Sequence, residues 1–353
     1  MHFNTYVFFI KTKNMIHIEE QLYKEIENSS LANKSFNFFD VFGQYIYFQF
    51  RNSTSKWYSS DNLEAFNQHS PSEIRYSLDD ISYVFNEFGF RSENFSSIKE
   101  GEPIVLYSGC SITAGVGLPL EHIWTSMVNK KISSDIKKDL KLYSLSHGGI
   151  SIDTITRLVY VAVNNNVIKP DMVFLNLPPV WRKEMFEYKM YNISSFQYLP
   201  NRTPNIEQRG LVKAWEKFVN LPYILNDMFK NLLMLKYFLE SKNIPMFFTF
   251  WDQQDVYDIA SQKDTNIGAI LDKNLPSALK ENYLGCFSMI LDRQIDVLRS
   301  TDPRAINWQK EYKQSIARDG MHYGPNSHVE LSTRFYNAIS NRNEYQDFLK
   351  KYR

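Results

Sequence analysis

The arrangement of apolar runs in the second part of the chain constrains the fold more than any other feature. Four short apolar runs are separated by longer stretches with helical spacing: PIVLYS (103–108), LKLYSLS (140–146), DMVFLNL (171–177) and IPMFFTF (244–250). Strands that alternate with helices form parallel sheets, because each parallel connection needs a long crossover that covers one face of the sheet. The sequence therefore predicts an α/β fold, a three-layer αβα sandwich with a mainly parallel, flavodoxin-like sheet.

Three segments between or after these runs have apolar residues at a helical period. They are SIDTITRLVYVAVNNNVI (151–168), ILNDMFKNLLMLKYFLESKN (224–243) and PNSHVELSTRFYNAIS (325–340), and the last one opens with a proline that suits a helix start. Residues 185–210 contain two prolines and no clean period. We expect an excursion there near the carboxyl edge of the sheet, where such loops shape pockets.

Residues 1–100 differ in texture from the rest of the chain. QYIYFQFR (44–51) alternates at a two-residue period, whereas SSDNLEAFNQHSPS (59–72) is polar and rich in turn-forming residues. We therefore expect a strand-containing N-terminal accessory region over residues 1–100 and the α/β domain over residues 101–353.

Charge and cysteine content exclude several classes of protein. Forty basic and 39 acidic residues leave a formal charge of +1, which is not the basic footprint of a nucleic-acid binder. The lysine-rich stretch NKKISSDIKKDLK (129–141) has interleaved aspartates and predicts the solvent-facing side of a helix. Two cysteines provide no disulfide framework. The apolar TYVFFI (5–10) is too short to span a bilayer and lacks a signal-peptide pattern, so we expect cytoplasmic synthesis without a membrane span.

The stretch LYSGCSITAGVG (106–117) places Ser111 between a predicted strand and a predicted helix. The first strand of an open parallel sheet ends at the crevice where ligands bind, and the helix that follows presents free N–H groups. A serine at this point can attack a substrate and help to stabilise the oxyanion that forms. The alternative is a serine that only caps the helix through its hydroxyl.

A second short stretch, ARDGMHYGPNSH (317–328), carries residues that complement this serine. Asp319 lies three residues before His322 in a loop that leads into the last predicted helix. A carboxylate so close in sequence can orient the imidazole through one ring nitrogen while the other nitrogen faces a serine hydroxyl. His322 could instead be a structural loop histidine, but strand, Gly-x-Ser, helix and a late Asp-x-x-His in this order favour nucleophilic catalysis.

These motifs resemble those of the SGNH, or GDSL-like, hydrolase family. GCSITAGVG (109–117) resembles the nucleophile block and DGMHYGPNSH (319–328) the Asp/His block, and the likeness covers roughly residues 80–340. SHGGISIDTI (146–155) resembles the second block. YVFNEFGFRSENF (83–95) resembles the Asn-x-x-Gly-Phe-Arg segment that precedes the nucleophile strand in a subset of these proteins.

The resemblance implies a role for each matching residue. Ser111 is the expected nucleophile, His322 the base, and Asp319 the residue that orients His322. The N–H groups of Ser111 and Gly149 are the expected oxyanion hole. We expect no cofactor and no metal.

The chain departs from the family pattern at the third block. After DMVFLNL the family has an asparagine whose side chain donates to the oxyanion, whereas this chain has PPVWRKE (178–184). Loss of one oxyanion donor typically costs about 2.7 to 4 kcal/mol of transition-state stabilisation. We name Arg182 and His147 as candidate substitutes; either residue could instead bind substrate or lie on the surface.

Two alternative interpretations of these motifs, a cysteine nucleophile and a zinc site, have less support. Cys110 is a poor candidate nucleophile, because adjacent side chains at a strand end point to opposite faces and Ser111 is the better match. A zinc site made of Asp319, His322 and His328 lacks a third convincing ligand, since His328 falls inside the last helix.

Beyond the triad, Trp251 and Asp252 directly follow a predicted strand and should lie at the same sheet edge. Asp252 could line a pocket or be an ordinary loop carboxylate. The sequence contains no Gly-rich phosphate loop and no dinucleotide fingerprint.

We therefore expect a serine esterase that acts on a carboxylic ester, with O-acetyl groups on a carbohydrate as the preferred substrate. Two other functions use the same residues or the same fold. An O-acyltransferase would pass the acyl group to an acceptor hydroxyl instead of water. A non-catalytic binding or structural protein, for instance part of a virus particle onto which the N-terminal region docks, would retain the fold alone. Oligomeric state has no signal in the sequence.

Overall fold

The computed structural model describes residues 50–67, 76–180, 182–186, 190–193, 221–250, 255–258, 263–286, 316–320 and 322–353. All of them belong to one compact unit formed by residues 45–353. The alternating run at 44–51 lies outside the described residues except for its last two positions. The division into an accessory region and an α/β domain at residue 100 therefore stays a prediction.

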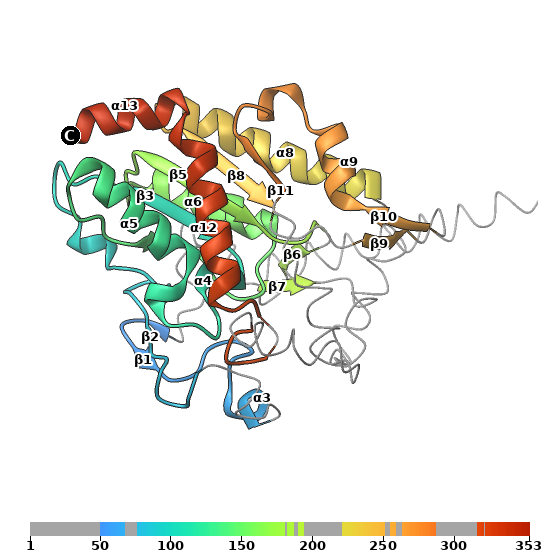
Figure 1. Ribbon diagram of the computed structural model, residues 1–353. Helices are drawn as coiled ribbons and strands as arrows, with labels where there is room; N and C mark the ends of the chain where they lie inside the picture. The colour runs from blue at the N-terminus through green and yellow to red at the C-terminus, as the bar shows by residue number, and fades with distance from the viewer. Residues whose placement is uncertain are drawn as a thin grey trace, which may run out of the picture. The chain divides into compact units, whose positions relative to one another are not determined.

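A five-stranded parallel sheet forms the middle layer of this unit (Figure 1). In spatial order its strands are β11 (Tyr283–Cys286), β8 (Met246–Phe250), β5 (Met172–Leu177), β3 (Val105–Gly109) and β4 (Tyr143–Ser144). Counted along the chain from β4, the order is 2-1-3-4-5, as in flavodoxin. The predicted fold class and the four predicted strands are confirmed.

The fifth strand, β11, was not predicted from the sequence. It lies at the edge of the sheet, three of its four residues are half exposed, and Gly285 has a positive φ of 98°. An edge strand of this kind has neither a continuous apolar run nor a clean alternation.

The connections of β3 and β5 create the crevice of the fold. β3 is followed along the chain by its neighbour β4, and β5 by its neighbour β8 on the other side, so the strand order reverses between β3 and β5. In open parallel sheets the crevice outside the carboxyl ends at such a point is where ligands bind. Ser111 directly follows β3 at this point.

Helices cover both faces of the sheet (Figure 1). One layer contains α5 (Trp124–Ile136), α12 (Pro325–Ser340) and α13 (Asn343–Tyr352), and the other contains α6 (Ile152–Asn164) and α8 (Leu221–Glu240). The helix predicted over 325–340 is confirmed with the same bounds, and the helices predicted over 151–168 and 224–243 are confirmed with shifted ends.

The predicted helix over residues 129–141 is wrong beyond Ile136. α5 ends there because Lys137 adopts the left-handed conformation with φ 53°, and the N–H of Lys138 then donates to the carbonyl of Ser133. The lysines of this stretch still lie at or near the surface.

Four aromatic side chains pack the helix layer of α5 and α12 against the sheet. Trp124 lies 5.0 Å from Phe335 and 5.6 Å from Tyr107 between ring centroids, and Phe174 lies 5.0 Å from Phe335. All four are buried. This cluster fixes the position of α12 and, with it, the loop that carries Asp319 and His322.

The remaining described elements are short and lie around the sheet. In chain order they are β1 (Thr54–Ser55), α3 (Leu63–Asn67), β2 (Tyr83–Val84), η2 (Phe95–Ser97), α4 (Ser111–Ala114), η3 (Leu120–His122), β6 (Lys183–Phe186), β7 (Met190–Ile193), β9 (Asp255–Asp258), β10 (Lys263–Asn266), α9 (Ile267–Asn274) and η5 (Ser277–Leu279). β6 and β7 form an antiparallel hairpin that overlaps the start of the expected excursion (185–210), and the other residues of the excursion lie outside the described ranges. Across the described part of the chain, no helix has the length and apolar character needed to cross a membrane.

Candidate active site

Ser111 is the first residue of α4, and its hydroxyl is not used to cap that helix. Cys110 occupies the N-cap position and no side-chain cap bond forms. Ser111 is only 4% exposed, and the one polar contact of its hydroxyl among the described residues is Cys110 Sγ at 3.9 Å. Within the described residues this hydroxyl makes no capping hydrogen bond to the backbone of α4, which argues against the helix-capping alternative.

Gly109 lets three elements meet just before this serine. A Cβ atom at Gly109 would lie 2.1 Å from Thr113 Oγ1 and 2.7 Å from the carbonyl oxygen of Asn176. No side chain fits at these distances, so the glycine of the Gly-x-Ser motif is required for the close packing of β3, α4 and β5.

Asp319 and His322 lie together in one loop, which we call the Asp/His loop (residues 316–320, 322 and 323). A β-bridge between Ile316 and Tyr323 closes the loop, and the N–H of Ala317 donates to the carbonyl of His322 at 2.9 Å. His322 Nδ1 lies 2.6 Å from Asp319 Oδ2, and the His322 N–H donates to Asp319 Oδ1 at 3.0 Å. The predicted Asp–His contact is therefore present.

The Asp319 carboxylate is fully buried and held in its charged form. Burial alone raises the pKa of Asp319, but the charge of His322, its two hydrogen bonds and the Ser60 hydroxyl together hold this pKa well below the usual range. An ionised carboxylate at Nδ1 places the Nδ1 proton between the two groups and leaves Nε2 of His322 as the acceptor.

The Asp/His loop docks on the loop that follows Ser111. The N–H of Arg318 donates to the carbonyl of Gly117 at 2.9 Å, and a Cβ atom at Gly117 would lie 2.7 Å from Ala317 Cβ. Among the described residues no hydrogen bond joins Ser111 Oγ to His322. The structure thus brings the two motifs to one sheet edge without closing the serine–histidine contact, which is common before substrate binds.

The turn that carries Gly149 lies beside the end of β3. The N–H of His147 donates to the carbonyl of Gly109 at 3.2 Å. Gly149 is exposed, has a φ of 80°, and a Cβ atom there would meet nothing within 4 Å. A side chain at this position would therefore enter open space at the carboxyl edge of the sheet.

His147 is buried next to this turn and is neutral at ordinary pH. Its Nδ1 lies 3.0 Å from the Gly148 carbonyl, and its ring meets Tyr58 edge-on with centroids 5.2 Å apart. Burial lowers the pKa of His147 to about 3, against a smaller opposing effect of the Gly148 carbonyl.

Arg182 lies at the amino-terminal ends of α6 and α8 rather than in contact with Ser111. It lines a small cavity together with Ile152 and Tyr223, and its backbone N–H donates to the Pro179 carbonyl at 3.2 Å. No hydrogen bond or ion pair of the described residues joins Arg182 to Ser111. Trp251 and Asp252 lie outside the described residues.

The remaining rival residues have structural partners or full burial. His328 Nδ1 accepts the N–H of Trp124 at 3.0 Å and so fixes α12 to the start of α5. Burial, with the nearby charges of His322 and Arg91, lowers the pKa of His328 to about 3. Cys110 is fully buried.

The segment before β3 (residues 83–95) has a structural role that its motif did not reveal. Arg91 is buried and donates to the carbonyl oxygens of Gly115 at 2.8 Å and Leu118 at 2.9 Å. Asn86 Oδ1 accepts the backbone N–H groups of Phe88 and Phe90, each at 3.0 Å. This segment therefore supports the loop that follows Ser111.

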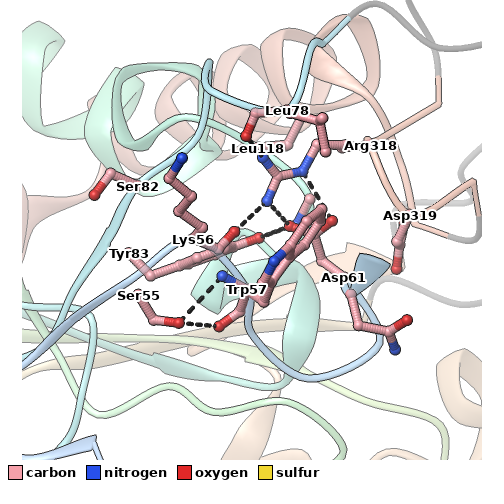
Figure 2. Close-up of polar contacts among 12 residues, drawn as sticks. Ser55, Lys56, Trp57, Asp61, Leu78, Ser82, Tyr83, Leu118, Arg318 and Asp319 are labelled. Carbon is pink, nitrogen blue, oxygen red and sulfur yellow. Dashed lines mark hydrogen bonds and ion pairs between the residues drawn. The ribbon is translucent and has the colours of Figure 1, made fainter. Parts of the chain in front are cut away.

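Residues 57–61, which we call the N-terminal segment, also reach the carboxyl edge of the sheet, and the sequence did not reveal this (Figure 2). Arg318 donates to Asp61 Oδ1 at 3.0 Å and Oδ2 at 2.7 Å, and both side chains are 0% exposed. The Trp57 ring lies 4.5 Å from the Arg318 guanidinium carbon. Ser60 donates to Asp319 Oδ2 at 2.8 Å. These residues fall in a stretch that looks like an ordinary polar turn, more than 250 positions before their partners.

Two buried polar side chains beneath the Ser111 turn were also missed. Thr113 Oγ1 and both amide atoms of Asn176 have no hydrogen-bond partner among the described residues. Asn176 pairs with Gly109 in the sheet register. Unsatisfied buried groups of this kind are rare in folded proteins and often mark ordered water or a functional site.

Comparison with known proteins gives matches among solved structures. No protein-family model matches the chain, and no curated protein matches it. An esterase, EstA from Pseudoalteromonas sp., is 13% identical over 67% of this chain and 96% of its own, with a TM-score of 0.36. A lipase from a goat rumen metagenome is 16% identical over 67% and 98%, with a TM-score of 0.37. An acetyl xylan esterase from Butyrivibrio proteoclasticus is 13% identical over 70% and 66%, with a TM-score of 0.33.

Proposed function

We propose that this chain is a serine ester hydrolase of the SGNH type, with Ser111, His322 and Asp319 as its catalytic residues. The observation that carries the proposal is the Asp319–His322 contact of 2.6 Å in a loop that is hydrogen-bonded to the loop following Ser111. The position of Ser111 at the crevice between β3 and β5 gives it further support, since the one polar contact of its hydroxyl among the described residues is Cys110 Sγ at 3.9 Å.

The reaction proceeds in two halves. His322 Nε2 removes the hydroxyl proton of Ser111 as Oγ attacks the ester carbonyl, and the same proton then passes to the departing alcohol oxygen. The acyl-serine that remains is attacked by water, which gives its proton to His322, and His322 returns this proton to Ser111 Oγ as the carboxylic acid leaves. Asp319 stays ionised and stabilises the imidazolium in both halves.

The N–H groups of Ser111 and Gly149 are the proposed donors to the oxyanion. The open space beside Gly149 supports this role, because it leaves room for a substrate next to this turn. His147 and Arg182 remain candidates for the donor that replaces the missing asparagine. The burial of His147 beside Gly148 favours an indirect role for it, through the shape of the turn.

For the substrate we propose a carboxylic ester, with O-acetyl groups on a carbohydrate as the preferred class. Trp57 is half exposed at the same edge of the unit, where an aromatic ring can pack against a sugar face. This preference is tested by comparing the rate at which the protein hydrolyses acetylated carbohydrates with the rate at which it hydrolyses simple aryl esters of longer acids.

The test of the reaction combines turnover with labelling. We expect the purified protein to hydrolyse a short-chain aryl acetate and to form a covalent adduct with a fluorophosphonate. Ser111→Ala and His322→Ala should each remove nearly all turnover, and combining them should cost little more, because residues that act as a unit are not additive. Cys110→Ala should still form the adduct.

A folded wild-type protein with neither turnover nor an adduct would contradict the proposal and favour the binding or structural alternative. Additive losses in the double variant would show that Ser111 and His322 do not act as one catalytic group. An adduct that maps to a residue other than Ser111 would refute its assignment as nucleophile.

A further inference from the structure

A tight turn from the N-terminal segment reaches the Asp319–His322 pair. We call residues 58–61 the Ser60 turn. The N–H of Tyr58 donates to the carbonyl of Asp61 at 2.9 Å, and the N–H of Asp61 donates to the carbonyl of Tyr58 at 3.1 Å. Ser59, with φ 59°, and Ser60 therefore form the tip of a turn with a closed base.

Both base residues of the Ser60 turn are anchored to the motifs of the proposed active site. Asp61 forms the buried ion pair with Arg318, the residue directly before Asp319. Tyr58 accepts the N–H of Gly148 through its hydroxyl at 3.1 Å, beside the turn that carries Gly149. The tip of the Ser60 turn thus has a fixed position relative to the catalytic carboxylate.

Ser60 contacts both members of the pair. Its hydroxyl donates to Asp319 Oδ2 at 2.8 Å and lies 3.3 Å from His322 Nδ1. Asp319 Oδ2 is the same oxygen that receives Nδ1 at 2.6 Å, while Oδ1 receives the backbone N–H of His322. The three side chains form a closed triangle, in which rotation of the carboxylate would break the hydrogen bond to Ser60.

We infer that Ser60 is a positioning residue that holds the Asp319 carboxylate in the orientation His322 needs for proton transfer. The inference rests on the proposed hydrolase function. A donor on Oδ2 makes this oxygen less basic, so the proton stays on Nδ1 and Nε2 remains free to take the proton of Ser111. Ser60 touches neither substrate nor the reacting atoms, and it acts only through Asp319 and His322.

The kinetic test compares Ser60→Ala with Ser60→Thr, which keeps the hydroxyl. A hydrogen bond to a charged group is strong enough that its loss should lower kcat about 10- to 100-fold. We expect KM to stay within about twofold, because Ser60 does not contact the substrate, and Ser60→Thr to restore most of kcat. Ser82→Ala is the matched control, since Ser82 is exposed and its hydroxyl has no hydrogen bond among the described residues.

A double-variant comparison separates positioning from a general structural effect. If Ser60 acts through the carboxylate, Ser60→Ala should change kcat little in an Asp319→Asn background. A loss of the same size in both backgrounds would overturn the inference, as would a Ser60→Ala enzyme whose kcat is within twofold of the wild type.

A spectroscopic readout keeps this inference distinct from the proposed reaction. The low-field proton resonance of the His322 Nδ1–H, assigned by its loss in His322→Ala, should shift in Ser60→Ala whether or not the protein turns over an ester. If the resonance shifts in Ser60→Ala but the wild-type protein does not hydrolyse an ester, the contact of Ser60 with the Asp319–His322 pair is supported and the proposed hydrolase function is rejected. Turnover with an unchanged resonance and unchanged kcat in Ser60→Ala would retain the hydrolase and reject the role of Ser60.

Discussion

Substitution of Asp61 by asparagine tests whether the buried ion pair holds the N-terminal segment on the α/β fold. Asp61 and Arg318 are both 0% exposed, so water cannot replace a lost partner. Asp61 Oδ2 also accepts the Tyr83 hydroxyl, which in turn accepts the N–H of Gly117 at 2.7 Å. Asp61→Asn therefore removes a charge that faces a guanidinium and a phenol and leaves the buried guanidinium without a counter-charge.

The structure sets the size of the expected effect. Removal of one partner from a buried ion pair costs about 3 to 5 kcal/mol, because an uncompensated charge remains in a dry site. With an unfolding entropy of about 2.1 cal/mol/K per residue, a unit of residues 45–353 should lose about 5 to 8 °C in Tm. Asp79→Asn is the matched control, since Asp79 pairs with Lys56 at 2.6 Å but both side chains are largely exposed, at 78% and 67%. It should cost less than about 1 kcal/mol.

Thermal unfolding followed by circular dichroism, together with urea unfolding to compare the slopes, measures both variants. Adding Arg318→Met to Asp61→Asn should recover part of the loss, because the double variant no longer buries an unpaired charge. An Asp61→Asn protein with the Tm of Asp79→Asn, or a double variant whose loss equals the sum of the single losses, would refute the reasoning.

Two further predictions follow from buried groups near the site. Gly117→Ala should destabilise the fold by about 1 to 3 kcal/mol and slow fluorophosphonate labelling, because φ is 77° and the new Cβ would lie 2.7 Å from Ala317 Cβ. The control is Gly101→Ala, which has a φ of 76° and open space around it and should cost no more than about 1 kcal/mol. Equal losses of stability in the two variants would contradict the role of close packing at Gly117. The pKa of His328 is about 3 in the folded protein, below its unfolded value of about 6.5. Its contribution to the free energy of unfolding is therefore complete above pH 6.5 and is lost as the pH falls toward 3, by up to about 1.4 kcal/mol per pH unit. His328→Gln should flatten the dependence of unfolding free energy on pH between 6.5 and 4 in urea titrations, and an unchanged slope would contradict the assignment.

The sequence by itself determined the local structure and the candidate catalytic residues. Apolar runs of strand length separated by helical periods predict the parallel sheet, because both signals depend only on neighbours along the chain. Asp319 and His322 are close in sequence, and a turn with a positive φ at Gly320 is enough to bring them together. Gly-x-Ser marks the turn between β3 and α4, since only glycine at position 109 fits between β3, α4 and β5.

Only the tertiary structure decided which distant segments complete the site. Ser60 and Asp61 meet their partners across more than 250 residues, and neither periodicity nor spacing records such a contact. β11 and the early end of α5 depend on edge exposure and on one left-handed residue, which propensity does not reveal. The physical reason is the same in each case: burial, charge pairing and close packing depend on the space around a residue, and that space is set by the whole fold rather than by the neighbouring residues in the chain.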